Sequence, residues 1–343
     1  MFTEDKLTVG VIGVGHWGPN IVRNLANHPR VQLRYVCDID TEAFKRVSRL
    51  VPKECQFVTD ASVIFSDVDV DAVAIITHAS THYDLGKQAL LSKKHVLCEK
   101  PLTLDVVKGE ELCQLAEASR LKLMVGLTFL FNNGVIKLRE LKSSGSLGRI
   151  YYMTSVRTHM GLVRQDVDVY WDLAPHDISI MNFVLGSVPE AVSATGAKVL
   201  GGEYYDVVFI TLYYPDGTIG QIHVSWVDSN KERVVCIIGS KARVAFDDLN
   251  ALETVRIFEK GISINEPVEA DFGKFRFLLR DGDINSPRID VTEPLSGLID
   301  AFVCFVLDDK EIVPDGRCAL EVTKALVAVR KSLASRGLRQ LIK

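Results

Sequence analysis

The chain has 343 residues, which predicts about two domains at roughly 150 residues each. Hydrophobic residues make up 47% and charged residues 24%, which is typical of globular proteins and excludes disordered, collagen-like and coiled-coil classes. The 40 basic and 44 acidic residues leave a net charge of −4, so no basic surface favours nucleic acid or an anionic membrane.

Targeting and redox signals point to the cytoplasm. The first ten residues lack the cationic start and apolar stretch of a signal peptide, and no apolar run approaches the ~20 residues of a membrane span. The seven cysteines are scattered without a C-x-x-C pair, which is typical of reduced thiols. We therefore predict a cytoplasmic protein with no membrane partner, no nucleic-acid partner and no metal.

Short apolar runs alternate with amphipathic stretches in the first third of the chain. The runs fall at 8–13, 31–38, 55–60, 71–77, 95–100 and 121–129, and amphipathic stretches lie at 20–26, 83–91 and 106–118. Near-continuous apolar runs are typical of parallel strands covered by helices on both faces. We predict an α/β, doubly wound Rossmann domain over residues 1–127.

The remainder of the chain has consecutive strand-like segments joined by short turns. These lie at 149–158, 191–200, 206–214, 218–227, 233–239 and 243–246, with helices expected at 132–143, 172–185, 295–307 and 315–333. Pro215-Asp216-Gly217 predicts a hairpin turn. We predict an α+β domain over residues 128–343, with a mostly antiparallel open-faced sheet for substrate binding and oligomerisation. The helices within 295–333 are candidates to pack back toward the first domain.

The segment Gly13-Val14-Gly15-His16-Trp17-Gly18 is a G-x-G-x-x-G loop between the first predicted strand and helix. Such glycines allow a tight turn, a close approach of pyrophosphate to the backbone, and close helix packing. Asp38 ends the second strand twenty residues after Gly18, where a carboxylate binds the ribose diol and repels a 2′-phosphate. This favours NAD over NADP; the alternative is a glycine-rich turn followed by an ordinary strand-end acid.

Glu99-Lys100-Pro101 follows the fifth predicted strand, and ligands of open α/β sheets bind at the carboxyl ends of strands. A lysine beside the expected nicotinamide can hydrogen-bond a reacting hydroxyl and transfer its proton. Pro101 restricts Lys100 to an extended backbone and can adopt the cis form. The alternative is a solvated loop lysine.

Asp172 and His176 stand four residues apart around Pro175, which is tolerated only in the first turn of a helix. We predict a helix that begins near 172–174 and carries both side chains on one face. His176 is then a candidate partner of Lys100 on the substrate hydroxyl, with Asp172 orienting it or binding a neighbouring hydroxyl. The alternative is an N-cap aspartate and a structural histidine.

Together, the glycine loop, Asp38, Glu99-Lys100-Pro101 and the D-x-x-x-H of 172–176 resemble the Gfo/Idh/MocA oxidoreductases over essentially the whole chain. The resemblance implies NAD as cofactor and Lys100, Asp172 and His176 as catalytic residues. The implied cofactor contacts are Gly13, Gly15, His16, Trp17, Gly18, Asp38, Ile39, Thr77, His82, Glu99 and Lys100. His78 stands where relatives commonly have proline, and the pair of His78 and His82 falls short of the three or four ligands of a zinc site.

The segment 157–172 is rich in arginine, aspartate and aromatic residues. Arg157 and Arg164 are candidates to clamp a diphosphate, and Tyr170 and Trp171 to pack on a sugar or base, with Asp172 and His176 completing the substrate site. Solvated loop charges are the alternative.

The sequences at 10–20 and 171–180 look most like the nucleotide-sugar branch of the family, and within it like bacterial UDP-N-acetylglucosamine 3-dehydrogenases. This resemblance implies NAD-dependent oxidation of the C3 hydroxyl of UDP-N-acetylglucosamine to a 3-keto sugar. The product would feed a PLP-dependent aminotransferase in amino-sugar, lipid A or surface-polysaccharide synthesis. It also implies a homodimer or homotetramer.

Three alternatives stay open. The substrate can be UDP-N-acetylglucosaminuronate, or a free polyol such as an inositol. From another class, the protein can be a non-catalytic regulatory module that holds NAD. The sequence also leaves open whether NADH is released or is reoxidised in place by a 2-oxo acid.

Overall fold

The computed structural model describes residues 6–161, 163–164, 166–264 and 277–343. The chain forms two compact units, one of Met1–Phe131 with Thr292–Val327 and the other of Asn132–Val291 with Ala328–Lys343. Within the described residues, none of the helices has the length and apolar character needed to cross a membrane. The division expected after residue 127, between an NAD-binding domain and a domain for substrate binding and oligomerisation, stays a prediction.

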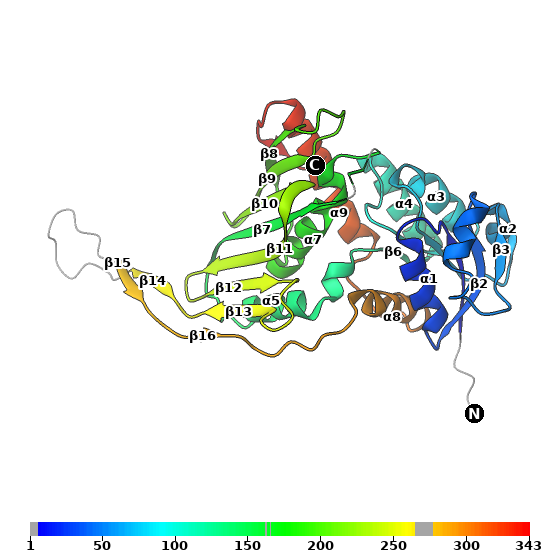
Figure 1. Ribbon diagram of the computed structural model, residues 1–343, viewed down its shortest axis with the longest axis horizontal. Helices are drawn as coiled ribbons and strands as arrows, with labels where there is room; N and C mark the ends of the chain where they lie inside the picture. The colour runs from blue at the N-terminus through cyan, green and yellow to red at the C-terminus, as the bar shows by residue number, and fades with distance from the viewer. Residues whose placement is uncertain (1–5, 162, 165, 265–276) are drawn as a thin grey trace. The chain divides into compact units, whose positions relative to one another are not determined.

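A parallel sheet with strand order β3-β2-β1-β4-β5-β6 forms the centre of the first unit (Figure 1). Its strands are β1 (Leu7–Ile12), β2 (Val31–Cys37), β3 (Gln56–Val58), β4 (Ala72–Ile75), β5 (His95–Cys98) and β6 (Leu123–Val125). The strand order reverses between β1 and β4, and ligands of such sheets bind beyond the carboxyl ends at this switch point. The predicted doubly wound fold is confirmed.

Helices cover both faces of this sheet. They are α1 (Gly18–Asn27), α2 (Ser62–Ser66), α3 (His82–Leu91), α4 (Val106–Ser119) and α8 (Pro294–Leu307), with 3₁₀ turns at Thr41–Arg46, Ala79–Thr81 and Thr128–Phe131. Val9 and Val11 of β1 belong to a core shared with α1 and α8, whereas Gly10 between them faces Ile64 of α2. This alternation follows from the two-residue period of a strand.

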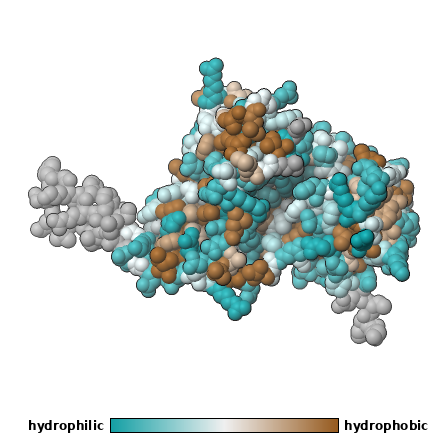
Figure 2. Space-filling view, viewed as in Figure 1, coloured by the Kyte–Doolittle hydropathy of each residue, from teal (hydrophilic) through white to brown (hydrophobic). Residues whose placement is uncertain are grey.

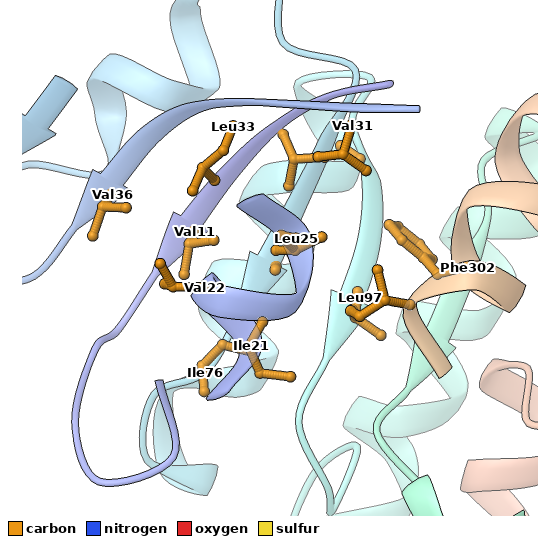
Figure 3. Close-up of a cluster of buried hydrophobic side chains, with 14 of the residues drawn as sticks. Val11, Ile21, Val22, Leu25, Val31, Leu33, Val36, Ile76, Leu97 and Phe302 are labelled. Carbon is orange, nitrogen blue, oxygen red and sulfur yellow. The ribbon is translucent and has the colours of Figure 1, made fainter. Parts of the chain in front are cut away.

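The core between the sheet, α1 and α8 consists of fully or nearly fully buried hydrophobic side chains, most of them aliphatic. Figure 3 shows Ile21, Val22 and Leu25 of α1 beside Val11 of β1, with Phe302 of α8 in the same cluster. The helical spacing of Leu295, Leu298, Ile299, Phe302 and Val303 gives α8 its buried face. A segment distant in sequence therefore completes the first core.

The sixth predicted strand is shorter than expected. Residues 121–129 were predicted as one strand, but β6 ends at Val125 and a 3₁₀ turn covers Thr128–Phe131. The amide of Gly126 still bonds to the carbonyl of Cys98 in β5 at 2.8 Å, and the chain then turns, with the amide of Leu127 donating to the carbonyl of Val125 at 2.7 Å. The short helix α2 has no counterpart in the sequence prediction, because five residues are too few to establish a helical period.

The second unit is built on a sheet of order β16-β13-β12-β11-β7-β10-β9-β8-β17. Its strands are β7 (Ile150–Met160), β8 (Ala191–Ala197), β9 (Val207–Tyr213), β10 (Ile219–Ser225), β11 (Val227–Gly239), β12 (Arg243–Asp247), β13 (Val255–Phe258), β16 (Ile284–Asn285) and β17 (Gln340–Leu341). Strands β14 (Gly261–Ile264) and β15 (Phe277–Arg280) pair separately. In the described sheet only β7 and β10 pair in parallel, so the mostly antiparallel prediction is confirmed.

Helices α5 (Asn133–Ser143), α7 (Ala174–Leu185) and the end of α9 (Gly316–Ala334) pack against this sheet. In α5, Gly134 lies against Phe246 of β12, and in α9 the hydroxyl of Ser332 accepts a bond from the amide of Ala194 in β8. The sheet also carries exposed apolar side chains, including Phe209 and Ile219. Figure 2 shows hydrophobic residues gathered on the second unit where β8 and β9 lie.

The helix predicted over 172–185 is divided in the structure. Asp172 ends the short helix α6 (Val169–Asp172), and α7 begins at Ala174. Pro175 has no amide hydrogen to continue the bonding pattern of α6, so the two helices separate at Leu173. The predicted start of the main helix is confirmed, but the placement of Asp172 and His176 on one continuous helix is wrong.

Candidate functional site

The glycine loop follows β1 and leads directly into α1. Gly13 has φ +94°, and a Cβ there would lie 2.7 Å from the carbonyl oxygen of Ile76, so only glycine fits. A Cβ at Gly18 would lie 3.0 Å from the carbonyl oxygen of Gly13, whereas Gly15 is exposed and faces open space. The loop thus has close packing at both ends and an accessible backbone in the middle, which fits a bound pyrophosphate.

Asp38 is positioned at the carboxyl end of β2, beside the glycine loop. Its two carboxylate oxygens accept bonds from the amide of Val14 at 2.7 Å and from the amide of Asp40 at 2.9 Å. A carboxylate has about four lone-pair sites, so acceptor capacity remains for a ribose diol. The neighbouring Ile39 is exposed, as are His16 and Trp17 in the loop. The residues of this edge therefore fit the adenosine and pyrophosphate of NAD.

His82 joins the loops that follow β4 and β5. Its Nδ1 lies 2.8 Å from the carbonyl oxygen of Pro101, and its Nε2 lies 3.2 Å from that of Thr77. The Thr77 hydroxyl is in turn 2.7 Å from the hydroxyl of Thr81. His82 is only 1% exposed, so its contacts fix the backbone of two loops rather than offer surface to a ligand.

The segment Glu99-Lys100-Pro101 leaves the carboxyl end of β5, and the Lys100–Pro101 peptide is cis. The amide of Lys100 donates to Oε2 of Glu99 at 3.0 Å. Burial raises the pKa of Glu99 to about 7, opposed by the charge of Lys100 and by the hydrogen bond from its amide. The first unit thus brings the glycine loop, Asp38, Thr77 and the Lys100 segment together at one edge of its sheet.

Asp172 in the second unit lies among basic side chains. Its Oδ1 is 3.5 Å from Nη1 of Arg164, and Arg164 also binds Asp166 through Nε at 2.9 Å and Nη2 at 2.6 Å. These acidic partners, Asp166 first, raise the pKa of Arg164 above its ordinary value. The structure therefore places Arg164 beside Asp172, at the end of α6.

His159 near the end of β7 was not singled out by the sequence analysis. Burial lowers its pKa, and the negative charge of Asp172 opposes that effect. The signal available in the sequence was its position inside the polar segment 157–172, which also holds Arg164 and Asp172. We add His159 to the groups that surround Asp172.

Arg157 points into the second unit rather than toward solvent. It is 5% exposed and donates from Nε and Nη2 to the two carboxylate oxygens of Asp177 at 2.9 and 3.0 Å. Asp177 is fully buried in the first turn of α7 and also accepts from the hydroxyl of Ser155 at 2.7 Å. This bidentate pair attaches α7 to β7, so the proposal below does not use Arg157 as a diphosphate clamp.

Tyr170 and Trp171 are likewise interior side chains, 1% and 4% exposed, with ring centroids 5.7 Å apart. Because a buried ring has little surface for a sugar or base, the proposal does not depend on them. His176 follows in the first turn of α7, one residue before Asp177. No group of three or more potential metal ligands occurs among the residues that the structure describes.

Two family profiles match the chain. The profile described as the Gfo/Idh/MocA oxidoreductase family with an NAD-binding Rossmann fold matches residues 7–127. A second profile, for the Gfo/Idh/MocA C-terminal domain, matches residues 135–245. The first profile falls on the unit that carries the glycine loop, Asp38 and Lys100.

Individual relatives align with most of the chain. UDP-N-acetylglucosamine 3-dehydrogenase of Acidithiobacillus ferrooxidans is 25% identical, covering 94% of this chain and 96% of the relative. Inositol 2-dehydrogenase of Rhizobium meliloti is 24% identical, with coverages of 95% and 97%. The crystal structure of GenD2 from gentamicin A biosynthesis has the same fold, with a TM-score of 0.82, 23% identity and coverages of 99% and 97%.

Proposed function

The chain belongs to the Gfo/Idh/MocA oxidoreductase family with an NAD-binding first unit, and from this premise we propose that it oxidises C3 of UDP-N-acetylglucosamine to the 3-keto sugar. The observation that carries the substrate is the alignment, over nearly the full length of both chains, with a UDP-N-acetylglucosamine 3-dehydrogenase. The inositol dehydrogenases align as well as this relative does, so the choice between them rests on the chemistry of the second unit.

In this proposal the first unit holds NAD through the residues at the carboxyl edge of its sheet. The amides of the glycine loop receive the pyrophosphate, and Asp38 accepts hydrogen bonds from the adenosine ribose. Glu99 and Lys100 lie on the nicotinamide side, after β5. When bound, NAD supplies the hydride acceptor for the oxidation.

Oxidation of the alcohol removes a hydride from C3 and a proton from its hydroxyl group. We assign Lys100 as the base that accepts this proton, since a lysine amine in its neutral form can do so. His176 assists in holding the hydroxyl, and Asp172 orients His176 or binds a neighbouring sugar hydroxyl. These three roles follow the family signature and are testable one residue at a time.

Arg164 is the side chain proposed for the diphosphate of the substrate. Its Nε and Nη2 bind Asp166 and its Nη1 lies 3.5 Å from Asp172. Unlike Arg157, this side chain is about one-third exposed, so in this proposal the diphosphate takes the place of Asp166 on the guanidinium. Guanidinium forms strong bidentate pairs with phosphate oxygens. A free polyol has no phosphate to form such a pair.

A substrate panel tests the proposal. Purified protein is incubated with NAD⁺ and either UDP-N-acetylglucosamine, UDP-N-acetylglucosaminuronate, N-acetylglucosamine or myo-inositol, and NADH is followed at its absorbance band. We expect turnover only with the UDP-linked sugars, and Arg164→Ala should raise KM for them at least tenfold. Turnover of myo-inositol with a better kcat/KM than either UDP-sugar would replace the proposal with a polyol dehydrogenase.

The catalytic assignment is tested by Lys100→Ala. Removing the base should abolish turnover while NAD binding, measured by calorimetry, stays within a few-fold of the unmodified protein. Near-normal activity of this variant would overturn the role of Lys100. If neither protein transferred a hydride to NAD with any substrate of the panel, the alternative of a non-catalytic NAD-binding module would be favoured instead.

The partners are part of the same proposal. We propose that exposed apolar residues of the second sheet, such as Phe209 and Ile219, contact a second copy in a homodimer or homotetramer. A 3-keto sugar is the substrate that a PLP-dependent aminotransferase needs to make a 3-amino sugar. Light scattering of the unmodified protein and of Phe209→Glu tests the proposed oligomer. A monomeric unmodified protein would exclude a homodimer or homotetramer. Coupling the reaction to an added aminotransferase tests whether the product is its substrate.

A further inference from the structure

Lys231 and Arg233 are two basic side chains in the first half of β11 that the sequence analysis did not single out. The guanidinium of Arg233 donates from Nη1 to Asp248 at 3.1 Å, and its Nε and Nη2 have no acceptor among the described residues. The Arg233 side chain is 37% exposed. Lys231 is exposed and forms no ion pair with any residue that the structure describes. Both cations are therefore available to an anionic ligand.

The pairing of β7 with β11 places Arg233 on the face of the sheet that α7 covers. Arg233 is directly opposite Arg157, and residues paired across an antiparallel ladder project from the same face. Arg157 binds Asp177 in the first turn of α7. Asp172, at the end of α6, precedes the start of α7 by two residues. Arg233 and the helical segment that carries Asp172 therefore share one face of the sheet.

Lys231 lies in a bulge of β11 opposite His159. Residues 228–231 face His159 alone, because regular pairing resumes where Glu232 meets Thr158. The hydroxyl of Thr158 donates to a backbone carbonyl within the bulge at 2.8 Å and attaches it to β7. Bulges redirect side chains and are common beside binding sites. This bulge brings Lys231 to the end of β7, where the segment that holds Arg164 begins.

The basic and the acidic side chains of this part of β11 act on different histidines. Burial lowers the pKa of His159, Asp172 opposes the shift, and the positive charges of the basic pair lower the pKa further. On the other face of the sheet, burial lowers the pKa of His223, and Asp228 and Glu232 oppose that shift. The charges are thus separated as the alternation of the strand predicts, with the basic pair on the side of Asp172.

Arg233 is held in place by residues of the second unit. Asp248 accepts from Nη1 of Arg233 through Oδ2, and from Nδ2 of Asn132 through Oδ1 at 3.0 Å. The amide of Asp248 donates to the carbonyl of Arg233 at 3.0 Å. Asn132 is itself fixed as the N-cap of α5. A guanidinium held in this way loses little further freedom when it binds a ligand.

We propose that Arg233 and Lys231 bind the diphosphate of the nucleotide-sugar substrate from the side of β11, Arg233 through Nε and Nη2 and Lys231 as a single charge. A guanidinium contacts two phosphate oxygens at once, whereas an ammonium contacts them as a point charge. The inference deepens the proposed function, because it rests on a UDP-linked substrate. The diphosphate is then shared between this basic pair and Arg164, and Asp248 is a positioning residue that acts through Arg233.

The first experiment measures the binding of UDP to the NAD⁺-loaded protein by calorimetry, without turnover. Arg233→Met and Lys231→Met should each weaken the affinity for UDP on the order of tenfold. Added salt should weaken UDP binding to the unmodified protein more than to either variant, because each variant has lost a contact between charges. The matched control Arg243→Met removes an arginine from the other face of the same sheet, where it stacks on Phe258, and should leave the affinity unchanged.

The second experiment measures initial rates with UDP-N-acetylglucosamine and with UDP-N-acetylglucosaminuronate. Arg233→Met and Lys231→Met should raise KM for both sugars on the order of tenfold and keep kcat within about twofold, because the diphosphate does not react. Arg233→Lys should recover part of the loss, and Asp248→Asn should give a smaller rise in KM. A purely structural role of Arg233 would instead lower the melting temperature and kcat without raising KM. A rise confined to the uronate would assign the pair to the sugar carboxylate and overturn the proposal.

These outcomes separate the inference from the proposed function. The inference is overturned if UDP does not bind the unmodified protein, if it binds both variants with full affinity, or if Arg243→Met weakens it equally. Lys231 is exposed and makes no contact on which the fold depends, so its variant reports on binding even if Arg233→Met is unstable. UDP binding that requires Lys231 and Arg233, combined with no oxidation of any UDP-sugar, would support the inference and overturn the proposed reaction.

Discussion

Replacing Arg157 tests whether this residue forms a structural ion pair in the second unit or clamps the diphosphate of the substrate. The side chain is 5% exposed and binds Asp177, which is fully buried, through two hydrogen bonds of 2.9 and 3.0 Å. In Arg157→Met, the carboxylate of Asp177 would remain buried, and among the described residues the hydroxyl of Ser155 would be its remaining side-chain donor. We expect this variant to be strongly destabilised.

The size of the effect follows from the burial of the pair. Breaking a buried ion pair by removing one partner costs about 3–5 kcal/mol, because the remaining charge is uncompensated. The double variant Arg157→Met with Asp177→Leu leaves no uncompensated buried charge, so its unfolding free energy should fall much less. The lost hydrogen bond of Ser155 should account for about 1 kcal/mol of that loss. Arg164→Ala is the matched control, since the partly exposed pair of Arg164 and Asp166 contributes about 1 kcal/mol or less.

Urea unfolding followed by the emission of Trp171 and Trp226 measures these differences, because both tryptophans lie in the second unit. The expected order of stability is unmodified protein, Arg164→Ala, the double variant, and Arg157→Met as the least stable. The reasoning is refuted if Arg157→Met loses less than about 1 kcal/mol. If that variant instead kept its stability and lost affinity for UDP tenfold, the sequence-based interpretation of Arg157 as a diphosphate clamp would be favoured.

Three further predictions concern the first unit. Gly13→Ala should abolish NAD binding in calorimetry and lower the melting temperature, because its Cβ would meet the backbone of Ile76. Gly15 faces open space, so Gly15→Ala should weaken NAD binding without lowering the melting temperature. Equal melting temperatures of the two variants would contradict this. Asp38→Ser combined with Ile39→Arg should shift the preference in kcat/KM from NAD toward NADP, and an unchanged preference would argue against Asp38 as the selector. Glu99 has a folded-state pKa raised from 4.5 to about 7, so its protonated form stabilises the fold at low pH and this stability is lost as the pH rises toward 7. Urea unfolding of Glu99→Gln and of the unmodified protein measures the difference between their unfolding free energies at each pH. This difference should shift in favour of the variant by about 2–3 kcal/mol as the pH rises from 5 to 8. A difference that does not change with pH would exclude the ionisation of Glu99 as its cause.

Much of the fold could be predicted because its signals are local. The apolar runs that became β1, β4 and β5 are near-continuous, and β1, β2 and β5 are followed by the glycine loop, Asp38 and the Lys100 segment that the structure places at strand ends. In the second unit the two-residue alternation and the Pro215-Asp216-Gly217 turn predicted the antiparallel pair of β9 and β10. The short elements α2, β16 and β17 were missed, since two to five residues do not display a period.

The candidate site was predictable to the extent that its residues form sequence motifs. The segments G-x-G-x-x-G, Asp38 and Glu99-Lys100-Pro101 each follow a strand, and a parallel sheet brings the carboxyl ends of its strands to one edge. The sequence was therefore sufficient to predict that these residues lie together in the NAD-binding unit. The break between α6 and α7 was not anticipated, because Pro175 affects the hydrogen bonding of residues on both sides of it.

The sequence by itself determined the parallel sheet, its glycine loop and the family to which the chain belongs, because strand period, turn residues and motif spacing act over short distances. Only the tertiary structure decided what individual side chains contact. It buried Arg157 against Asp177, and it enclosed Tyr170 and Trp171. An arginine has the same chemistry in a buried pair and in a phosphate site, and only the packing of distant segments determines which partner it meets.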